Sequence, residues 1–550
     1  MSNKAEDIIQ GYETLKSQRS TVDNVYRDIE RLILPNYQGS EHKLADNEGN
    51  RKQPISNIAT DAAILLGSNL YSYTYSTTDR NFILKSNEPT QSDNTNRWLQ
   101  KASDTALKYL QTSNISSVYG EFCQALTTFG TAVASVEFDA DNYELIFKHH
   151  PITGEVCIIE GPDGRVDGIM RKLKLSARQA LAMFGEEGLC DRAKEALTNL
   201  SLINEKFEYV LSVQSNPKQN PEKIGIQYAK YTSDYVCCVD KRIVKSSGYK
   251  TFPYIVARWI KSYDGSPYGI GSGSVALPAV RKINDSEAEL HDAFAMAARP
   301  PVFVNDDGVI EIDEIKPGTV IYTDLTQANP TQLNIHSRPD VIMARIQQLT
   351  EQISKSFFNH VFLSVNSSSG GPRTATEIDA IQSEKLQSLT PLVANLRSEF
   401  WAPMVERIIY LLLDNGLIEK PDAETMGKGY RIEYVSQLDA RLSVIEANKT
   451  LMALRGAAEI LATAAQAPDI DKVFKAVEAA KRHLEASNVD FDLIVSDVER
   501  REMDEVELQA AIEQQAQQAQ EQILNKMGNV DPNKKPETGS VADTLGQTIL

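Results

Sequence analysis

The sequence has few cysteines and no long apolar run. The five cysteines are Cys123, Cys157, Cys190, Cys237 and Cys238. This odd number, without a C-x-x-C pair, excludes a disulfide framework, fits a reducing cytosol and argues against a zinc site. The N-terminal segment lacks the apolar region of a signal peptide, and the longest strongly apolar run, 408–413, is far shorter than the roughly 18 residues of a membrane span. We therefore expect a soluble protein made in the cytosol.

An excess of basic charge is also missing. The chain has 57 Lys and Arg against 75 Asp and Glu, which gives a formal net charge of −18. Proteins that bind nucleic acid tightly are usually basic, and this chain is not. If it meets DNA, it must hold it by local basic groups or only confine it loosely. The composition, 41% hydrophobic and 24% charged, is typical of globular proteins. With 550 residues, the chain is too long for a single hydrophobic core, so we expect two to four substructures.

The first half of the chain predicts helices followed by a mixed region. Apolar residues at spacings near 3.6 predict a helix over 5–34. Further helices are expected over 55–76, which is rich in Ala and Leu, and over 91–113 and 117–129. From residue 131 to 175, alternating segments separated by turn residues at 139–142 and 161–164 predict antiparallel hairpins. Short helices are then expected at 176–184 and 191–200, and strands at 206–214, 225–240 and 252–260.

The second half is mostly helical. A Gly- and Ser-rich turn at 268–278 precedes a predicted helix at 279–298, short strands within 302–340, and a helix at 340–362. Thr374 and Glu377 form a capping box that opens a long helix ending at Asn415–Gly416, and Pro391 and Pro403 predict a kink or interruption in it. Beyond it we expect a strand at 430–435, helices at 440–466, 469–486 and 497–527, and a polar, disordered tail.

Three patterns could carry chemistry. Glu287 and His291 stand four residues apart on a helix, a spacing that suits two metal ligands, but no H-E-x-x-H motif exists and a solvated helix face is favoured. The pair His149–His150 is expected at the surface. The glycines of 269–273 precede a helix, as in phosphate-binding loops, but their spacing fits no such motif and favours a flexible turn.

Two segments suggest a role in an assembly. Six of the ten residues of 364–373, SVNSSSGGPR, are Ser or Gly, and this loop between helical segments could be presented to a partner or be an ordinary surface loop. The helix at 497–527 is rich in Gln and Ala and polar almost all round. Alone it would be marginal, so it either packs beside other copies or is a frayed, exposed helix.

The order of these elements and four local segments resemble the portal (head-to-tail connector) protein of short-tailed, podovirus-type bacteriophages. The segments are SQRSTVDNVYRDIERLILP (17–35), FPYIVARWIKSYDGSPYGIGSGSVALPAVRKIND (252–285), ARPPVFV (298–304) and RTATEI (373–378). Within the second segment, the recognisable points are Arg258-Trp259, Tyr268-Gly269 and 276–278. The likeness covers about 20–435.

The resemblance implies an α+β, predominantly helical chain that forms a homododecameric ring at one capsid vertex of the virion. Double-stranded DNA would pass transiently through its channel during packaging and ejection. The terminase large subunit and then tail adaptor or head-completion proteins would dock on it, and the major capsid and scaffold proteins would surround it. No enzymatic activity, cofactor, metal or membrane contact is implied.

The resemblance also implies a map of the chain. The wing would span 1–270, the first stem helix 271–300, the clip 301–340, the second stem helix 341–363, the tunnel loop 364–373, the long kinked wing helix and strand 374–435, the crown 436–496, the C-terminal barrel-like helix 497–527 and the disordered tail 528–550.

Candidate site residues follow from this map. Tunnel-loop residues that could face DNA are Ser364, Asn366, Ser367, Ser368, Ser369, Gly370, Gly371 and Arg373. Stem residues that could face the channel or a neighbour are Arg281, Lys282, His291, Arg345 and Lys355. Clip residues that could dock a partner are Asp306, Asp307, Glu311 and Lys316. Two alternatives stay open: another virion structural protein, such as a scaffold or tail component, and a metal-dependent hydrolase that uses Glu287 and His291.

Overall fold

The computed structural model divides into two compact units, Met1–Asp439 and Ala440–Leu550. It describes residues 2–35, 37, 55–77, 80–86, 93–154, 156–199, 202, 205–220, 223, 225–262, 265–300, 302–305, 320–323, 331–332, 339–363, 390–421 and 429–434, and in the second unit only 452, 456, 509 and 517–518. The predicted loop 364–373, the start of the long helix at 374–389 and the predicted helices and tail beyond 435 therefore lie outside the described residues.

The N-terminal segment forms two helices, α1 (Ser2–Gln18) and α2 (Ser20–Leu32), where we predicted one over 5–34. The break falls at Arg19, whose guanidinium is drawn into the interior. It donates to the carbonyl oxygens of Ile152 and Val156 and to the Asp23 carboxylate. The two helices consequently serve different cores: α1 packs in a small cluster on the five-stranded sheet, and α2 packs in the main core.

The next three helices were predicted correctly: α3 (Ile58–Thr74), α4 (Asp93–Thr112) and α5 (Ile115–Phe129). Strand β1 (Phe82–Ser86) was not predicted. It pairs antiparallel with β15 (Tyr430–Tyr434), the strand that we expected at 430–435. Two segments far apart in the sequence are thereby joined by backbone hydrogen bonds that no local pattern reveals.

Two antiparallel sheets follow, as the hairpin patterns predicted. The first has the order β3 (Glu144–His150), β2 (Thr131–Asp139), β9 (Tyr254–Arg258). The second has the order β4 (Val156–Glu160), β5 (Val166–Ser176), β6 (Lys206–Ser215), β7 (Tyr231–Cys237), β8 (Arg242–Tyr249). Strand β8 was missed, and the predicted strand 225–240 is shorter because a 3-10 turn, η2 (Ile226–Tyr228), precedes β7.

Helices cover the second sheet. Helix α6 (Ala177–Phe184) opens with a capping box between Ser176 and Gln179. A 3-10 turn, η1 (Glu186–Gly188), connects it to α7 (Asp191–Thr198). The ring of Phe184 packs on Tyr209 of β6 and Tyr235 of β7, with centroids 5.0 and 5.2 Å apart. Both short helices were predicted within two residues of their observed bounds.

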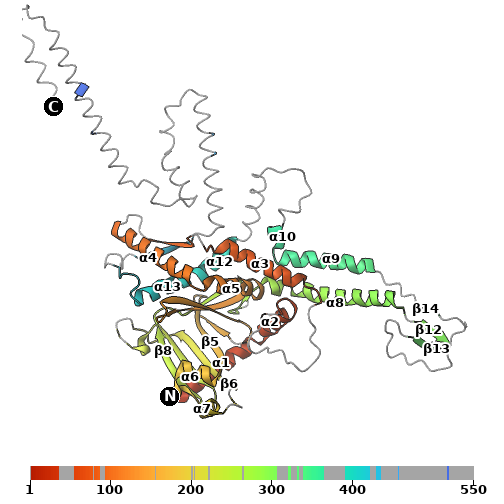
Figure 1. Cartoon of the computed structure of the whole chain (residues 1–550), viewed down its shortest axis with the longest axis horizontal. Helices are drawn as coiled ribbons and strands as arrows, with labels where there is room; N and C mark the ends of the chain where they lie inside the picture. Colours follow the sequence, from red (N-terminus) through yellow and green to blue (C-terminus); the bar gives the residue numbers. More distant parts are fainter. Residues whose placement is uncertain are drawn as a thin grey trace, which may run out of the picture. The chain divides into compact units, whose positions relative to one another are not determined.

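The strands β10 (Ile260–Lys261) and β11 (Gly269–Ile270) pair and lead into α8 (Ser272–Ala298), which Figure 1 shows beside α9 (Pro339–Ser356). The predicted second helix of this pair, 340–362, is interrupted before α10 (Asn359–Leu363), where Phe358 adopts a φ of 55°. Between α8 and α9, β12 (Val302–Asn305) pairs parallel with β13 (Val320–Thr323) and antiparallel with β14 (Thr331–Gln332).

The long helix is interrupted, as its prolines predicted. The described part consists of α12 (Thr390–Leu396), a π-helical turn η3 (Arg397–Trp401) and α13 (Ala402–Asp414), with Pro403 in the first turn of α13. Gly416, at φ 71°, ends α13 as a left-handed cap, as predicted. Within the described part of the chain, no helix is both long and apolar enough to span a bilayer.

Candidate functional site

The glycine-rich segment before α8 is a close backbone contact, not the flexible turn that we predicted. A Cβ atom at Gly271 would lie 2.4 Å from both the Gly130 nitrogen and the Thr128 oxygen, and one at Gly269 would lie 2.3 Å from the Gly130 oxygen. The helix also begins at Ser272, before Pro278, because this turn is buried against the end of α5. Backbone fills the space that a bound phosphate would need.

Replacement of Gly271 by Ala is expected to lower the free energy of unfolding by about 1–3 kcal/mol, because the added methyl group must displace backbone. Gly120 of α5 is the matched control, since a Cβ there meets nothing within 4 Å. Gly120→Ala should leave the protein as stable or slightly more stable, because Ala favours the helix. Urea unfolding of the two variants checks this, and equal stabilities would contradict the close contact.

The first half of α8 is anchored in the body. Ala276, Val280 and Ile283 are buried in the main core, and the Asn284 side-chain oxygen accepts hydrogen bonds from the backbone nitrogens of Ile55 and Ser56 at 2.7 and 3.2 Å. From residue 285 to the end of α8, no residue is buried. The second half of the helix therefore relies on contacts other than those of the core.

Helix α9 shows the mirror arrangement, because its second half is the anchored one. Leu349 and Ile353 are buried, as is Phe357 just after the helix, whereas the turns from Val341 to Gln348 contain no buried residue. The periodic spacing of Ile346, Leu349 and Ile353 had predicted one apolar face, and this face packs in the main core. The α8–α9 pair thus has an anchored end and an exposed end.

Of the five predicted stem residues, one forms an ion pair with the body, and the other four are exposed on α8 and α9. The Arg281 guanidinium pairs with the Asp28 carboxylate of α2, so it joins α8 to the body. Lys282, His291, Arg345 and Lys355 are exposed. The Arg345 guanidinium donates to the Gln348 side-chain oxygen at 2.6 Å. The candidates of the tunnel loop and of the clip (Asp306, Asp307, Glu311 and Lys316) lie outside the described residues.

The two histidine patterns are resolved differently. His291 is exposed, and no group of three or more His, Cys, Asp or Glu side chains in the described ranges includes it or Glu287. The expectation that His149–His150 lies at the surface is wrong. His150 is 3% exposed, its Nδ1 accepts from Arg171 at 2.7 Å and its Nε2 lies 2.8 Å from the Ser135 hydroxyl. His150 is the last residue of the edge strand β3, and its side chain is turned inward, toward Ser135 of β2 and Arg171 of β5.

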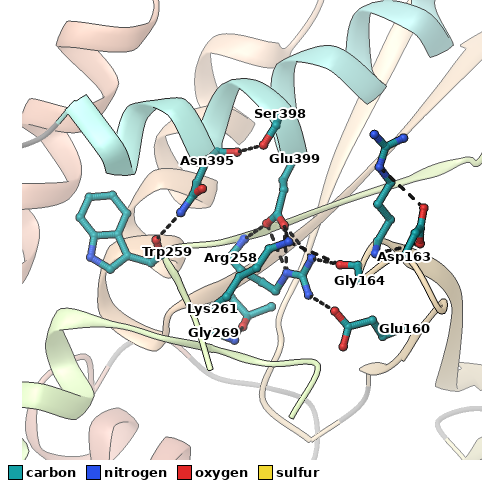
Figure 2. A network of polar contacts seen from close by, with 12 residues as sticks. Glu160, Asp163, Gly164, Arg258, Trp259, Lys261, Gly269, Asn395, Ser398 and Glu399 are labelled. Atoms are coloured by element: carbon teal, nitrogen blue, oxygen red, sulfur yellow. Dashed lines mark hydrogen bonds and ion pairs between the residues drawn. The ribbon is translucent and has the colours of Figure 1, made fainter. Parts of the chain in front are cut away.

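A buried ion-pair network joins the π-helical turn to the strand that leads toward α8 (Figure 2). The Arg258 guanidinium, 3% exposed, donates to the Glu399 carboxylate at 2.6 Å and to the Glu160 carboxylate at 2.8 Å. Glu399 also accepts from the Arg258 backbone nitrogen at 2.7 Å. Burial lowers the pKa of Arg258, but hydrogen bonds to Glu399 and Glu160 outweigh it and raise the pKa.

The network ties together three parts of the chain. Arg258 lies on β9, and Glu399 belongs to η3. The third part is the β4–β5 hairpin, which supplies the Glu160 carboxylate and the carbonyl oxygen of Gly164, both of which accept from Arg258 at 2.8 Å. Lys261 adds a partner for Glu399 at 3.2 Å. In the sequence, Arg258-Trp259 stands out only as a point of resemblance to the portal family. The available signal was a charged residue inside the otherwise apolar run PYIVARW.

Comparisons with known proteins agree on one family. The family model described as "Bacteriophage head to tail connecting protein" matches residues 5–495. The "Probable portal protein" of Bordetella phage BPP-1 is 24% identical over 540 residues, 95% of each chain. The "Portal protein" of Salmonella phage epsilon15 is 22% identical over 444 residues, 78% of each chain. The chain therefore belongs to the family of bacteriophage head to tail connecting proteins.

Proposed function

We propose that copies of this chain form the portal of a phage head: a ring of twelve at one capsid vertex, through which double-stranded DNA enters and leaves. The observation that carries the proposal is the α8–α9 pair, anchored at one end and exposed at the other. Family membership and the names of the two relatives support the same function. In this ring, α8 and α9 are the stem and the body around β2 and β5 is the wing.

Exposed apolar side chains favour contact between copies along the stem. Phe294 near the end of α8 is 51% exposed, and Val341 and Met343 near the start of α9 are each 55% exposed. All three lie at the exposed end of the α8–α9 pair, and exposed apolar side chains that gather in one region usually mark an interface. In a ring, each α8–α9 pair has a neighbouring pair on either side that can cover them.

The charges of the stem suit a channel that guides DNA without gripping it. Helix α8 carries the basic residues Arg281 and Lys282 against the acidic residues Asp285, Glu287, Glu289 and Asp292. Each phosphate neutralised by Lys or Arg adds salt-dependent affinity, which would slow translocation. With Arg281 paired to Asp28, Lys282, His291, Arg345 and Lys355 remain as the stem groups for brief phosphate contacts.

The tunnel loop and the clip complete the proposal. Ser and Asn side chains of 364–373 can donate to phosphates without net charge, and Arg373 supplies one cation for a backbone contact. The segment 301–340, with its strands β12–β14, is the docking site that we propose for the terminase large subunit and then for tail adaptor proteins. Deletion of 301–340 should abolish that docking and leave the wing folded.

Replacement of Phe294 and Met343 by Glu is expected to reduce ring formation at least about tenfold, because each contact between copies would then bury an unpaired charge. The matched control is Ile226→Glu, which changes a 53% exposed side chain of η2, outside the α8–α9 pair. Native mass spectrometry and incorporation into capsids of the same phage report assembly. Normal rings from the double variant would contradict the proposed interface.

A further inference from the structure

Cys190, Cys237 and Asp240 meet beside the five-stranded sheet, at the end of β7 and the start of α7. Their sulfur and carboxylate oxygen atoms all lie within 4.8 Å of one another. We propose that these three side chains bind a thiophilic divalent cation of the zinc class, with a water molecule as fourth ligand. Two thiolates, a carboxylate and water are a donor set that tetrahedral Zn²⁺ accepts.

The turn between β7 and β8 holds two of the proposed ligands, Cys237 and Asp240, close together. Cys237 and Asp240 are spaced as C-x-x-D, and Lys241 after them has a φ of 49°, which folds the turn back on itself. The backbone N–H groups of Asp240 and Val239 face the Cys237 sulfur. Such donors stabilise a metal-bound thiolate, because they share its negative charge. A search for C-x-x-C motifs does not reveal this arrangement.

Cys190 comes from a separate element. It is the N-cap residue of α7, but its side chain makes no capping hydrogen bond, so the thiol is free to face the turn. The partners of Arg242 support the same geometry: it lies 3.4 Å from the Asp240 carboxylate and donates to the carbonyl oxygen of Leu189, the residue before Cys190, at 2.7 Å.

An unsatisfied hydroxyl group points independently to a missing ligand. Tyr209 on β6 is directly opposite Cys237 in the sheet and is completely buried. Its hydroxyl group has no hydrogen-bond partner among the described residues, and it lies within electrostatic reach of Cys237, Cys190 and Asp240. Buried polar groups are rarely left without a partner. A metal-bound water would supply one.

Metal binding would release two protons and leave one net negative charge at the site. Both cysteines release their protons to solvent, and the two thiolates and the carboxylate bring three negative charges to a divalent cation. The remaining negative charge faces the Arg242 guanidinium. Because Cys190 and the C-x-x-D turn are far apart in the sequence, the metal would fasten α7 to the β7–β8 hairpin within the sheet domain.

Cobalt(II) titration of the reduced, full-length protein tests the proposal. We expect equimolar binding with thiolate-to-cobalt charge-transfer absorption and the visible bands of tetrahedral Co²⁺, both removed by added Zn²⁺. Cys190→Ser, Cys237→Ser and Asp240→Asn should each weaken binding by about tenfold or more. Cys238→Ser is the matched control, because Cys238 packs on the other face of the sheet, in the α1 cluster, and should bind as the parent chain does.

A second measurement uses the unaltered chain, in case a variant fails to fold. Zn²⁺ should slow the alkylation of Cys190 and Cys237, mapped by mass spectrometry, and leave that of Cys157 and Cys238 unchanged. Three results would overturn the proposal: no Co²⁺ band with thiolate character, the same band in Cys237→Ser, or a Cys190–Cys237 disulfide in protein purified without an oxidant.

Discussion

Replacement of Arg258 by Met is expected to lower the free energy of unfolding by about 3–5 kcal/mol, the usual cost of breaking a buried ion pair on one side. The side chain of Glu399 is only 12% exposed, so its carboxylate would lose its guanidinium partner in a place where water cannot fully replace it. Lys261 would offset part of this cost, but it stands at 3.2 Å and cannot replace the several bonds of a guanidinium.

The β4–β5 hairpin, which contributes Glu160 to the network, also offers a matched control. Arg165 pairs with Asp163 at 3.8 Å, and these side chains are 88% and 62% exposed. Arg165→Met should change the free energy of unfolding by less than about 0.5 kcal/mol, because exposed pairs contribute little. Urea unfolding at neutral pH measures both variants, with Glu399→Gln as a third. If Arg258→Met were no more destabilising than Arg165→Met, the network would not hold η3 in place.

Acidification is expected to destabilise the body through its two buried histidines. Burial lowers the pKa of His149 to about 4 and that of His150 to about 2, from an ordinary value of 6.5. In the unfolded chain both rings bind protons below about pH 6.5, while in the folded chain they stay neutral. The free energy of unfolding is therefore highest above pH 6.5. It decreases as the pH falls from 6.5, by roughly 2 kcal/mol per histidine at pH 5.

The surroundings of His150 explain why protonation is unfavourable. The Arg171 guanidinium donates to Nδ1, so an added proton there would face a donor and a second positive charge. The pairing leaves Nε2 to bond with Ser135. A neutral ring accepts from Arg171 at Nδ1 and donates from Nε2 to the Ser135 hydroxyl, whereas a charged ring keeps the Ser135 bond but can no longer accept from Arg171.

Urea unfolding at pH 7 and pH 5 tests this account. His150→Gln keeps an acceptor and a donor but cannot titrate, so its loss of stability between the two pH values should be about 2 kcal/mol smaller than that of the parent chain. His291→Gln is the control, because His291 is exposed on α8. An equal pH dependence in all three proteins would show that His150 is not held neutral.

Local patterns predicted the elements that depend on local order. Helices α3, α4 and α5 and the β2–β3 and β4–β5 hairpins are indicated by residues that are neighbours in the sequence, and each was found as expected. The interruption of the long helix also followed from Pro403, next to the π-helical turn.

The features that were missed depend on residues distant in sequence. Arg19 breaks the first helix because Ile152 and Val156 offer it carbonyl oxygens, and β1 exists because β15 pairs with it. Helix α8 starts early because the glycines before it pack on the end of α5. None of these partners stands in the same stretch of sequence, so periodicity could not indicate them.

In the candidate site, too, the sequence predicted what depends on neighbouring residues and missed what depends on distant ones. Sequence spacing placed Lys282, His291, Arg345 and Lys355 on helices, where they are exposed, but could not reveal that Asp28 engages Arg281. The cluster of Cys190, Cys237 and Asp240 likewise forms only when α7 lies on the β7–β8 turn.

Cryo-electron microscopy of the assembled protein tests the central claim most directly. The account predicts a ring of twelve copies in which α8 and α9 line a channel about as wide as a DNA duplex, with Phe294 and Met343 covered by the neighbouring copy. A closed oligomer without a channel, or a ring in which α8 and α9 face outward, would contradict it.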